Sequence, residues 1–280
     1  MIVAKSKSKP ASAARGVGYD AMVDWDKRLA REVPFLQRAF AEAGGVHRVI
    51  DVGAGTGQHA IALVRSGYDV VGVDPGAEML ERARANAAAA GAHVRFVEGG
   101  FGDLVTLGVG PADAAICTGN ALPHVAGLAG LDAALADLAA VIRPGGVLVL
   151  HLLNHARLLE KRPRFLGPVV RDLPGGDTLV FLRLFEYDPP QAPERIWIEF
   201  VTSAKDDASA EAGDADLGWS VTANRSAHTV MPLPVLRAAL ERAGFGGVKV
   251  FGDHGGKVFE PDADESVVLT ASRDRRSGTA

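Results

Sequence analysis

Residues 49–57 read VIDVGAGTG, in which an apolar run passes directly into a loop with three glycines. The apolar run predicts a short strand over 47–52, and the periodicity that follows predicts a helix over 57–66. Glycines at such a junction let the backbone turn sharply and approach a ligand closely. The N-terminus of the following helix adds free N–H groups and positive potential. The stretch therefore predicts a strand–loop–helix unit that binds a ligand through its backbone.

The alternation of strand and helix continues on both sides of this unit. The apolar patterns predict helices over 24–43, 77–90 and 128–142, and strands over 68–74, 94–98, 112–117 and 147–152. Strands that alternate with crossover helices form a parallel sheet with helices on both faces. We therefore predict an α/β fold, a doubly wound Rossmann-like sheet whose ligand lies beyond the carboxyl ends of the strands.

In the second half of the chain, strands no longer alternate with helices. Three long strands without intervening helices are expected at 179–187, 195–204 and 219–230. A helix at 232–243 and two further strands at 248–251 and 266–271 are expected to follow. This pattern predicts an antiparallel β insert that covers the binding edge. We expect a disordered basic tail (1–18), a cofactor-binding core (19–160) and an antiparallel insert or substrate lid (161–230). The chain then returns to the core sheet (231–273) and ends in a frayed tail (274–280). Within the insert, the acidic stretch 206–216 is expected to be a mobile loop.

Composition excludes several classes of protein. The chain has 280 residues, 48% hydrophobic and 23% charged, which is typical of a folded globular protein. Its net charge is −4, and residues 1–18 carry four basic side chains and no acidic one, so the body of the chain carries −8. A body this acidic argues against a nucleic-acid partner. No apolar run is long enough to cross a membrane, and 1–18 has no secretory signal pattern. With Cys117 as its one cysteine, the chain is expected in a reducing cytoplasm.

The acid at the end of the second strand narrows the type of ligand. Asp74 follows Asp51 by 23 positions, where a carboxylate can accept hydrogen bonds from a ribose diol. Any ribose-bearing cofactor would fit this arrangement. The fingerprint for nicotinamide dinucleotides is G-x-G-x-x-G, whereas this loop reads G-x-G-x-G and has Gln58 at the sixth position. The spacing therefore disfavours NAD.

Taken together, residues 49–57, Asp74, the Pro144-Gly145-Gly146 turn and Ala243-Gly244-Phe245 resemble the class I S-adenosylmethionine-dependent methyltransferases. The resemblance covers residues 19–272. It implies a seven-stranded mixed sheet in which the last strand is antiparallel, and S-adenosyl-L-methionine as the cofactor.

Residues 115–124, together with Tyr19, Trp25, Arg28 and Gly252-Asp253, are similar to the glycine and sarcosine N-methyltransferases. The resemblance implies that Arg28 pairs with the cofactor carboxylate, that Asp74 holds the ribose and that Thr118 presents its carbonyl to the cofactor amine. The cofactor-binding set that it implies is Trp25, Arg28, Gly53, Ala54, Gly55, Asp74, Met79, Gly100, Phe101, Thr118 and His124. It places Asn120, Leu153 and Asn154 at the substrate. A general base is needed only where the acceptor arrives protonated or is a hydroxyl, and the candidates for it are His124, Tyr19 and His151.

Two positions depart from this family. Gly100 stands where relatives have Asp or Asn against the adenine amine, so that contact is expected to move to the Phe101 N–H or to Asp103. Leu153 stands where the glycine-specific enzymes carry an Arg that clamps the substrate carboxylate. Loss of this planar, bidentate partner argues against free glycine as the acceptor. A replacement cation at Arg157, Lys161 or Arg225 stays open.

The roles of the histidines and of the aromatic residues in the insert can each be interpreted in two ways, as structural or as functional. His151 and His155 straddle a strand end, where a spacing of four does not share a face, so no metal site is expected. His59 is expected to be exposed or to cap a helix. Trp197, Phe200 and Trp219 either pack the insert or form the wall of an acceptor pocket.

The sequence thus predicts a cytoplasmic S-adenosylmethionine-dependent methyltransferase acting on a small molecule, with N-methylation by in-line displacement as the favoured reaction. A small-molecule O-methyltransferase with a phenol or carboxylate acceptor is the alternative, and an NAD-type oxidoreductase or a non-catalytic binding module are the more distant ones. No nucleic-acid or membrane partner is expected, and the sequence leaves homo-oligomerisation open.

Overall fold

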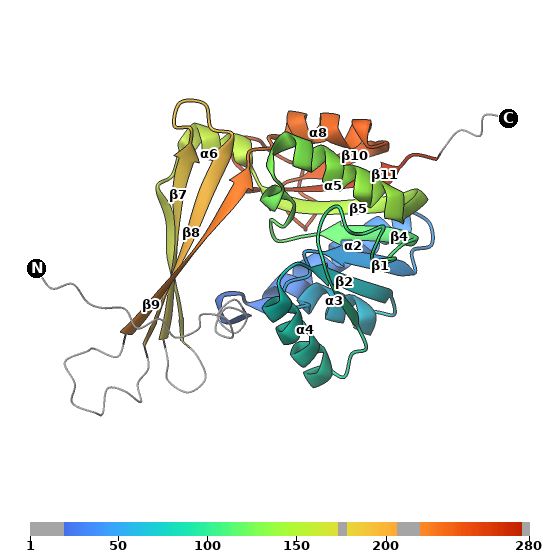
Figure 1. The fold of residues 1–280 in the computed structure, drawn as a ribbon, viewed down its shortest axis with the longest axis horizontal. Coiled ribbons are helices and arrows are strands. Elements are labelled where there is room, and N and C mark those ends of the chain that lie inside the picture. Colours follow the sequence, from blue (N-terminus) through green and yellow to red (C-terminus); the bar gives the residue numbers. More distant parts are fainter. Residues whose placement is uncertain (1–19, 173–177, 206–218, 276–280) are drawn as a thin grey trace, which may run out of the picture.

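The computed structural model describes residues 20–172, 178–205 and 219–275. Two sheets dominate the described chain, a central sheet flanked by helices and a second sheet of long strands beside it (Figure 1). The predicted tail at 1–18, residues 276–280 of the predicted tail at 274–280, and the predicted loop at 206–216 lie outside the described residues, as does Tyr19. No described helix is both long and apolar enough to cross a membrane.

The central sheet has seven strands in the order β10-β11-β5-β4-β1-β2-β3. Strands β1 to β5 run parallel to one another, and β11 pairs antiparallel with both β5 and β10. This topology confirms the predicted seven-stranded mixed sheet. Its strands are β1 (Arg48–Val52), β2 (Asp69–Asp74), β3 (Arg95–Glu98), β4 (Ala112–Cys117), β5 (Ile142–Leu153), β10 (Phe245–Phe251) and β11 (Ser266–Arg273).

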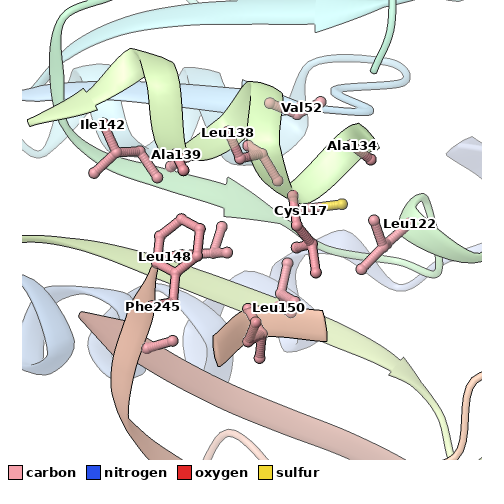
Figure 2. Close-up of a cluster of buried hydrophobic side chains, with 14 of the residues drawn as sticks. Val52, Cys117, Leu122, Ala134, Leu138, Ala139, Ile142, Leu148, Leu150 and Phe245 are labelled. Atoms are coloured by element: carbon pink, nitrogen blue, oxygen red, sulfur yellow. The ribbon is translucent and has the colours of Figure 1, made fainter. Parts of the chain in front are cut away.

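Helices cover both faces of this sheet, as the alternating pattern predicts. The helices are α2 (Trp25–Glu42), α3 (Gln58–Arg65) and α4 (Ala77–Ala89) on one face, and α5 (Gly127–Val141) and α8 (Leu233–Arg242) on the other. Apolar residues that alternate along each strand separate into two cores, one per face. Figure 2 shows part of the core on the α5 and α8 side, where Leu148 and Leu150 of β5 pack with Phe245 and Leu138.

The second sheet is antiparallel, with its strands in the order β6-β7-β8-β9. Its strands are β6 (Phe165–Asp172), β7 (Thr178–Asp188), β8 (Arg195–Lys205) and β9 (Trp219–Thr229). Ile196, Ile198 and Phe185 on its inner face pack with Leu158 of α6 (His155–Lys161) and with Leu153 at the end of β5. This cluster joins the second sheet to the carboxyl edge of the first, which confirms the antiparallel insert.

Two local features differ from the sequence prediction. The Pro144-Gly145-Gly146 segment lies inside β5, which begins at Ile142, because an irregular register between β4 and β5 absorbs the turn. Strand β6 and helix α6 also have no counterpart in the predicted elements. Seven of the eight residues of β6 are exposed, so burial leaves no periodic apolar signal there.

Candidate functional site

The glycine loop after β1 occupies the predicted place at the carboxyl edge of the sheet. The N–H groups of Gly53 and Ala54 both donate to the Val73 carbonyl, at 2.8 and 3.0 Å, and this anchors the loop to β2. Gly53 and Gly55 have left-handed backbones, with φ of 77° and 55°. A Cβ at Gly53 would collide with that of Ala121, whereas a Cβ at Gly55 would meet nothing within 4 Å. The loop therefore leaves open space beside Gly55 for a ligand.

Asp74 holds the far side of this loop. Its Oδ2 accepts from Gly55 N at 2.8 Å, and its Oδ1 accepts from Gly76 N at 2.8 Å. Burial raises the pKa of the Asp74 carboxyl, and these two N–H groups oppose the rise. Each carboxylate oxygen keeps a second lone pair, which is what a pair of ribose hydroxyls requires.

Asp51, in the quoted motif but absent from the predicted site residues, lies beneath the loop. It is 1% exposed, and neither of its carboxylate oxygens has a well-formed hydrogen bond within the described residues. Burial raises its pKa to about 6, and Asp74 raises it further, while His59 lowers it. A buried carboxylate without partners is costly, so this position fits a ligand that carries a cationic group.

A buried ionic network connects the loop to α2. Arg28 Nε donates to Glu32 Oε1 at 2.8 Å, and His59 Nε2 lies 2.5 Å from Glu32 Oε2. Burial by itself would raise the pKa of Glu32, but the hydrogen bond and charge of His59, together with Arg28, hold it well below its usual range. Thr118 Oγ1 lies 3.4 Å from His59 Nδ1 and extends the network to the end of β4. His59 is 5% exposed, so its expected exposed or capping role is wrong.

Trp25 and Arg28 lie together at the start of α2. The Arg28 guanidinium stacks 5.1 Å from the Trp25 ring centroid, and Trp25 Nε1 donates to Asp20 Oδ1 at 3.0 Å. Trp25 also meets His59 edge to face at 5.7 Å. The structure thus brings Trp25, Arg28, Thr118 and the glycine loop to one edge. Glu32 and His59 belong to the same group, although no local pattern in the sequence links them.

The predicted adenine-side residues follow β2 and β3. Met79 is half-buried on α4 beside Gly76, and Phe101 is half-buried against the α5-side core. The Gly100 N–H donates to Asp103 Oδ2 at 3.0 Å, so Asp103 already has a partner in this turn. The Phe101 N–H is accordingly the better of the two expected replacements for the missing polar side chain.

Three histidines meet where the second sheet touches the core. His124 ends the short helix η1 (Leu122–His124), and its ring centroid lies 4.7 Å from that of His228 on β9. His155, the first residue of α6, lies 6.3 Å from His228. Burial lowers the pKa of His124, while the charge of Asp74 raises it. His228 was not among the predicted site residues, because only the register of β9 against η1 brings it there.

His155 is held in one tautomer. Its Nδ1 accepts from Met231 N at 3.0 Å, so Nε2 carries the proton, and burial lowers the pKa to about 4. A histidine that stays neutral in the folded state takes up a proton on unfolding below pH 6.5. It therefore stabilises the fold fully above pH 6.5, and this contribution is lost as the pH falls towards 4.

We expect the variant His155→Asn to flatten the pH dependence of stability. Asn Oδ1 can accept from Met231 N but does not titrate. The wild type should lose about 2 kcal/mol more unfolding free energy between pH 7 and pH 5 than the variant does. Urea unfolding at the two pH values measures this difference. Equal losses in both proteins would contradict the assignment of a buried neutral imidazole.

The predicted substrate residues separate into different environments. Asn120 Oδ1 accepts from Leu153 N at 2.5 Å, which ties the loop after β4 to the end of β5. Leu153 packs with the inner face of the second sheet. Asn154 is 3% exposed, and its side chain caps α6 and donates to the carbonyls of Pro261 and Asp264. Its polar groups are therefore used within the fold.

The aromatic residues of the insert do not all lie on the same face of the second sheet, so they do not form a single pocket wall. Phe200 faces inward and packs with the cluster that contains Leu153. Trp197 lies on the opposite face, because β-strand side chains alternate, and it stacks against Arg195 and Arg225. The side chain of Trp219 lies outside the described part of the chain.

The alternation of side chains along the strands also determines which basic side chain of the second sheet faces the core. Arg225 pairs with Glu186 on the outer face, and Lys161 pairs with Glu160 at 2.8 Å. Arg157 approaches Glu265 at 3.8 Å. Arg183 is paired in register with Phe200 on the inner face, and burial lowers its pKa while Glu265 raises it. Arg183 was not predicted as a site residue because the residues around it in the strand form an apolar run.

Part of this chain is similar in sequence to proteins of known family. Residues 49–146, which hold the glycine loop, Asp74 and β1 to β4, match the family model described as a methyltransferase domain. This segment is thus similar to methyltransferase domains. A glycine/sarcosine N-methyltransferase of Parasynechococcus marenigrum is 37% identical over 142 residues, which is 51% of this chain and 50% of that protein. The chain thus spans about half the length of the curated relatives it matches.

Solved structures resemble the methyltransferase domain together with the second sheet. An S-adenosylmethionine-dependent methyltransferase from Clostridium acetobutylicum superposes with a TM-score of 0.71 at 13% identity, covering 91% of this chain and 94% of that one. The sugar N-methyltransferase KedS8 from Streptoalloteichus superposes with a TM-score of 0.70 at 21% identity, covering 98% and 99%. At these identities the likeness establishes the fold, a class I methyltransferase fold with an antiparallel insert.

Proposed function

We propose that this protein transfers a methyl group from S-adenosyl-L-methionine to a small molecule, with a nitrogen as the acceptor atom. The observation that carries the proposal is the open space beside Gly55, bounded by the Asp74 carboxylate within the matched methyltransferase domain. Relatives named as glycine/sarcosine N-methyltransferases support nitrogen. O-methylation of a phenol or a carboxylate remains the alternative.

The residues at this edge fit the groups of that cofactor. Asp74 would accept from the ribose hydroxyls, and the buried carboxylate of Asp51 would attract the cationic ammonium of the methionine part. Arg28 would stand near the cofactor carboxylate, with Trp25, Gly53, Ala54 and Thr118 around it. Met79, Gly100 and Phe101 would flank the adenine. When bound, the cofactor supplies an electrophilic methyl on its sulfonium.

The chain's own part in the reaction is positioning. The acceptor nitrogen attacks the methyl carbon with its lone pair, the carbon–sulfur bond breaks, and the sulfur keeps the bonding electrons. Holding the two reacting atoms in line at contact distance supplies most of the acceleration for such a step. A proton leaves the nitrogen, and we propose His124 as the base that takes it, with His228 beside it at 4.7 Å. The second sheet would exclude water from the edge.

A binding comparison tests the cofactor. Thermal shift and calorimetry with S-adenosylmethionine, its demethylated product and NAD should show stabilisation by the first two and none by NAD. Stabilisation by NAD alone would replace the proposal with an oxidoreductase. Binding of the methionine cofactor without turnover of any amine, phenol or acid would favour a non-catalytic binding module.

The acceptor is expected to be larger than glycine. Leu153 and Phe200 pack against the same apolar cluster, and a small carboxylate buried beside that cluster would lack a partner at a cost of several kcal/mol. We expect kcat/KM for free glycine and sarcosine to be lower than for bulkier amines, among which the inward-facing Arg183 favours those with a distant acidic group. Steady-state methylation of a glycine series against aromatic amines and phenols measures this. A kcat/KM for glycine above every larger acceptor would restore the amino-acid assignment.

A further inference from the structure

A second group of chemically competent side chains lies on the α2 side of the sheet. Glu32 of α2, His151 of β5 and His254 in the loop after β10 each present one ligand atom, and these atoms lie within 4.8 Å of one another. The rings of His151 and His254 meet edge to face at 4.8 Å. Three elements far apart in the sequence thus converge on one point.

Both imidazoles have an unused nitrogen in this group. His151 Nδ1 and His254 Nε2 are buried and lack a hydrogen-bond partner among the described residues. A buried polar atom without a hydrogen-bond partner destabilises the fold, so a pair of such atoms indicates a ligand. Burial lowers the pKa of His151 to about 3 and that of His254 to about 4. Imidazole coordinates metal ions in its neutral form.

The surroundings fix these ligands and leave room beside them. Glu32 is held by Arg28 and by His59, each through one carboxylate oxygen, so each oxygen keeps a lone pair. Arg38 Nη2 donates to the His254 carbonyl at 3.2 Å and fixes that loop. All three residues line a cavity of about 440 Å³, which is large enough for an ion with bound water.

We propose that Glu32, His151 and His254 bind a divalent first-row transition-metal ion, with Zn²⁺ as the best fit. Two imidazoles and one carboxylate are ligands typical of zinc, and a set of three leaves one position open. Ligand atoms of tetrahedral zinc lie about 3.4 Å apart, so no two of the three ligand atoms need to approach by more than about 1.4 Å. The open position would face the cavity, where Arg31 and Arg38 favour an anion or a hydroxide as the fourth ligand.

This inference differs from the sequence expectation, which paired His151 with His155 and found no metal site. His155 lies in the cluster with His228, whereas His151 projects towards α2. The carboxylate and the third ligand come from residues more than 100 positions away, where spacing rules do not reach.

The test uses the chelator-treated full chain with ZnCl₂ in calorimetry and with CoCl₂ in visible absorption, without cofactor or acceptor. We expect one ion per chain and an intense visible band for tetrahedral cobalt. The variant His254→Ala removes a side chain from a surface loop and should weaken binding at least about 100-fold. Glu32→Gln, which keeps the shape of the side chain, should also weaken it. Circular dichroism and melting curves establish that both variants are folded.

Two control variants separate this site from others. His93→Ala removes an exposed histidine, and His228→Ala removes one from the other cluster, and neither should change the affinity. The proposal is overturned if the wild type binds neither ion, or if folded His254→Ala and Glu32→Gln bind as tightly as the wild type. Because no cofactor is present, a negative result leaves the methyl-transfer proposal standing.

Discussion

The variant Gly55→Val is expected to abolish binding of S-adenosylmethionine while the protein stays folded. Gly55 has a left-handed backbone at φ 55°, and a Cβ there points into space that no described atom occupies. A branched side chain would fill the space that we assign to the cofactor and would also strain the backbone by about 1–2 kcal/mol. Calorimetry should detect no binding up to millimolar cofactor.

Gly91→Val is the matched control for this prediction. Gly91 has φ of 61°, and a Cβ at this residue also meets nothing within 4 Å, but it lies just beyond the C-terminal end of α4, at the other end of that helix from Asp74. The control carries the same backbone strain without touching the proposed cofactor space. It should lower the melting temperature as Gly55→Val does and keep the wild-type affinity. Normal product formation by Gly55→Val would contradict the placement of the loop.

The second large effect is expected from Asp74→Ala. Removal of the carboxylate takes away the proposed ribose acceptor and also frees the N–H groups of Gly55 and Gly76. We expect the binding free energy of S-adenosylmethionine to weaken by about 2–3 kcal/mol, the scale of hydrogen bonds to a charged group. Calorimetric affinity measures the change. An affinity equal to that of the wild type would exclude Asp74 from the ribose site.

Asp113→Ala separates the ribose contact from a general loss of structure. Asp113 Oδ2 also accepts from two backbone N–H groups, those of His47 and Arg48, both at 2.8 Å. It lies at the opposite edge of the sheet, near the start of β4. This control should lower stability and leave cofactor affinity unchanged, whereas Asp74→Ala should change affinity even where the two variants have equal stability.

Much of the fold was predictable because its signals are local. Period-two and period-3.6 patterns mark every strand and helix of the central sheet, and the glycine loop with Asp74 marks its binding edge. Crossover handedness then leaves few topologies for such an alternation. The antiparallel insert was predictable from the sequence because its three longest strands follow one another without helices between them.

The arrangement of side chains around the site depended on tertiary structure. His59 reads as a polar residue at a helix start, yet packing against α2 buries it against Glu32. Trp197 and Phe200 both read as candidates for a pocket wall, but a strand places residues three apart on opposite faces. Which of those faces meets the core is decided by the pairing of β7, β8 and β9.

The sequence by itself determined the sheet, its glycine loop and the acid that holds it, because each follows from neighbours within a few residues. The tertiary structure alone decided the groupings of Glu32 with His151 and His254, of His124 with His228, and of Arg183 with Phe200. Each of these groups joins segments from different elements. Their contacts arise from strand register and from helix packing on the sheet, and neither leaves a periodic signal in the chain.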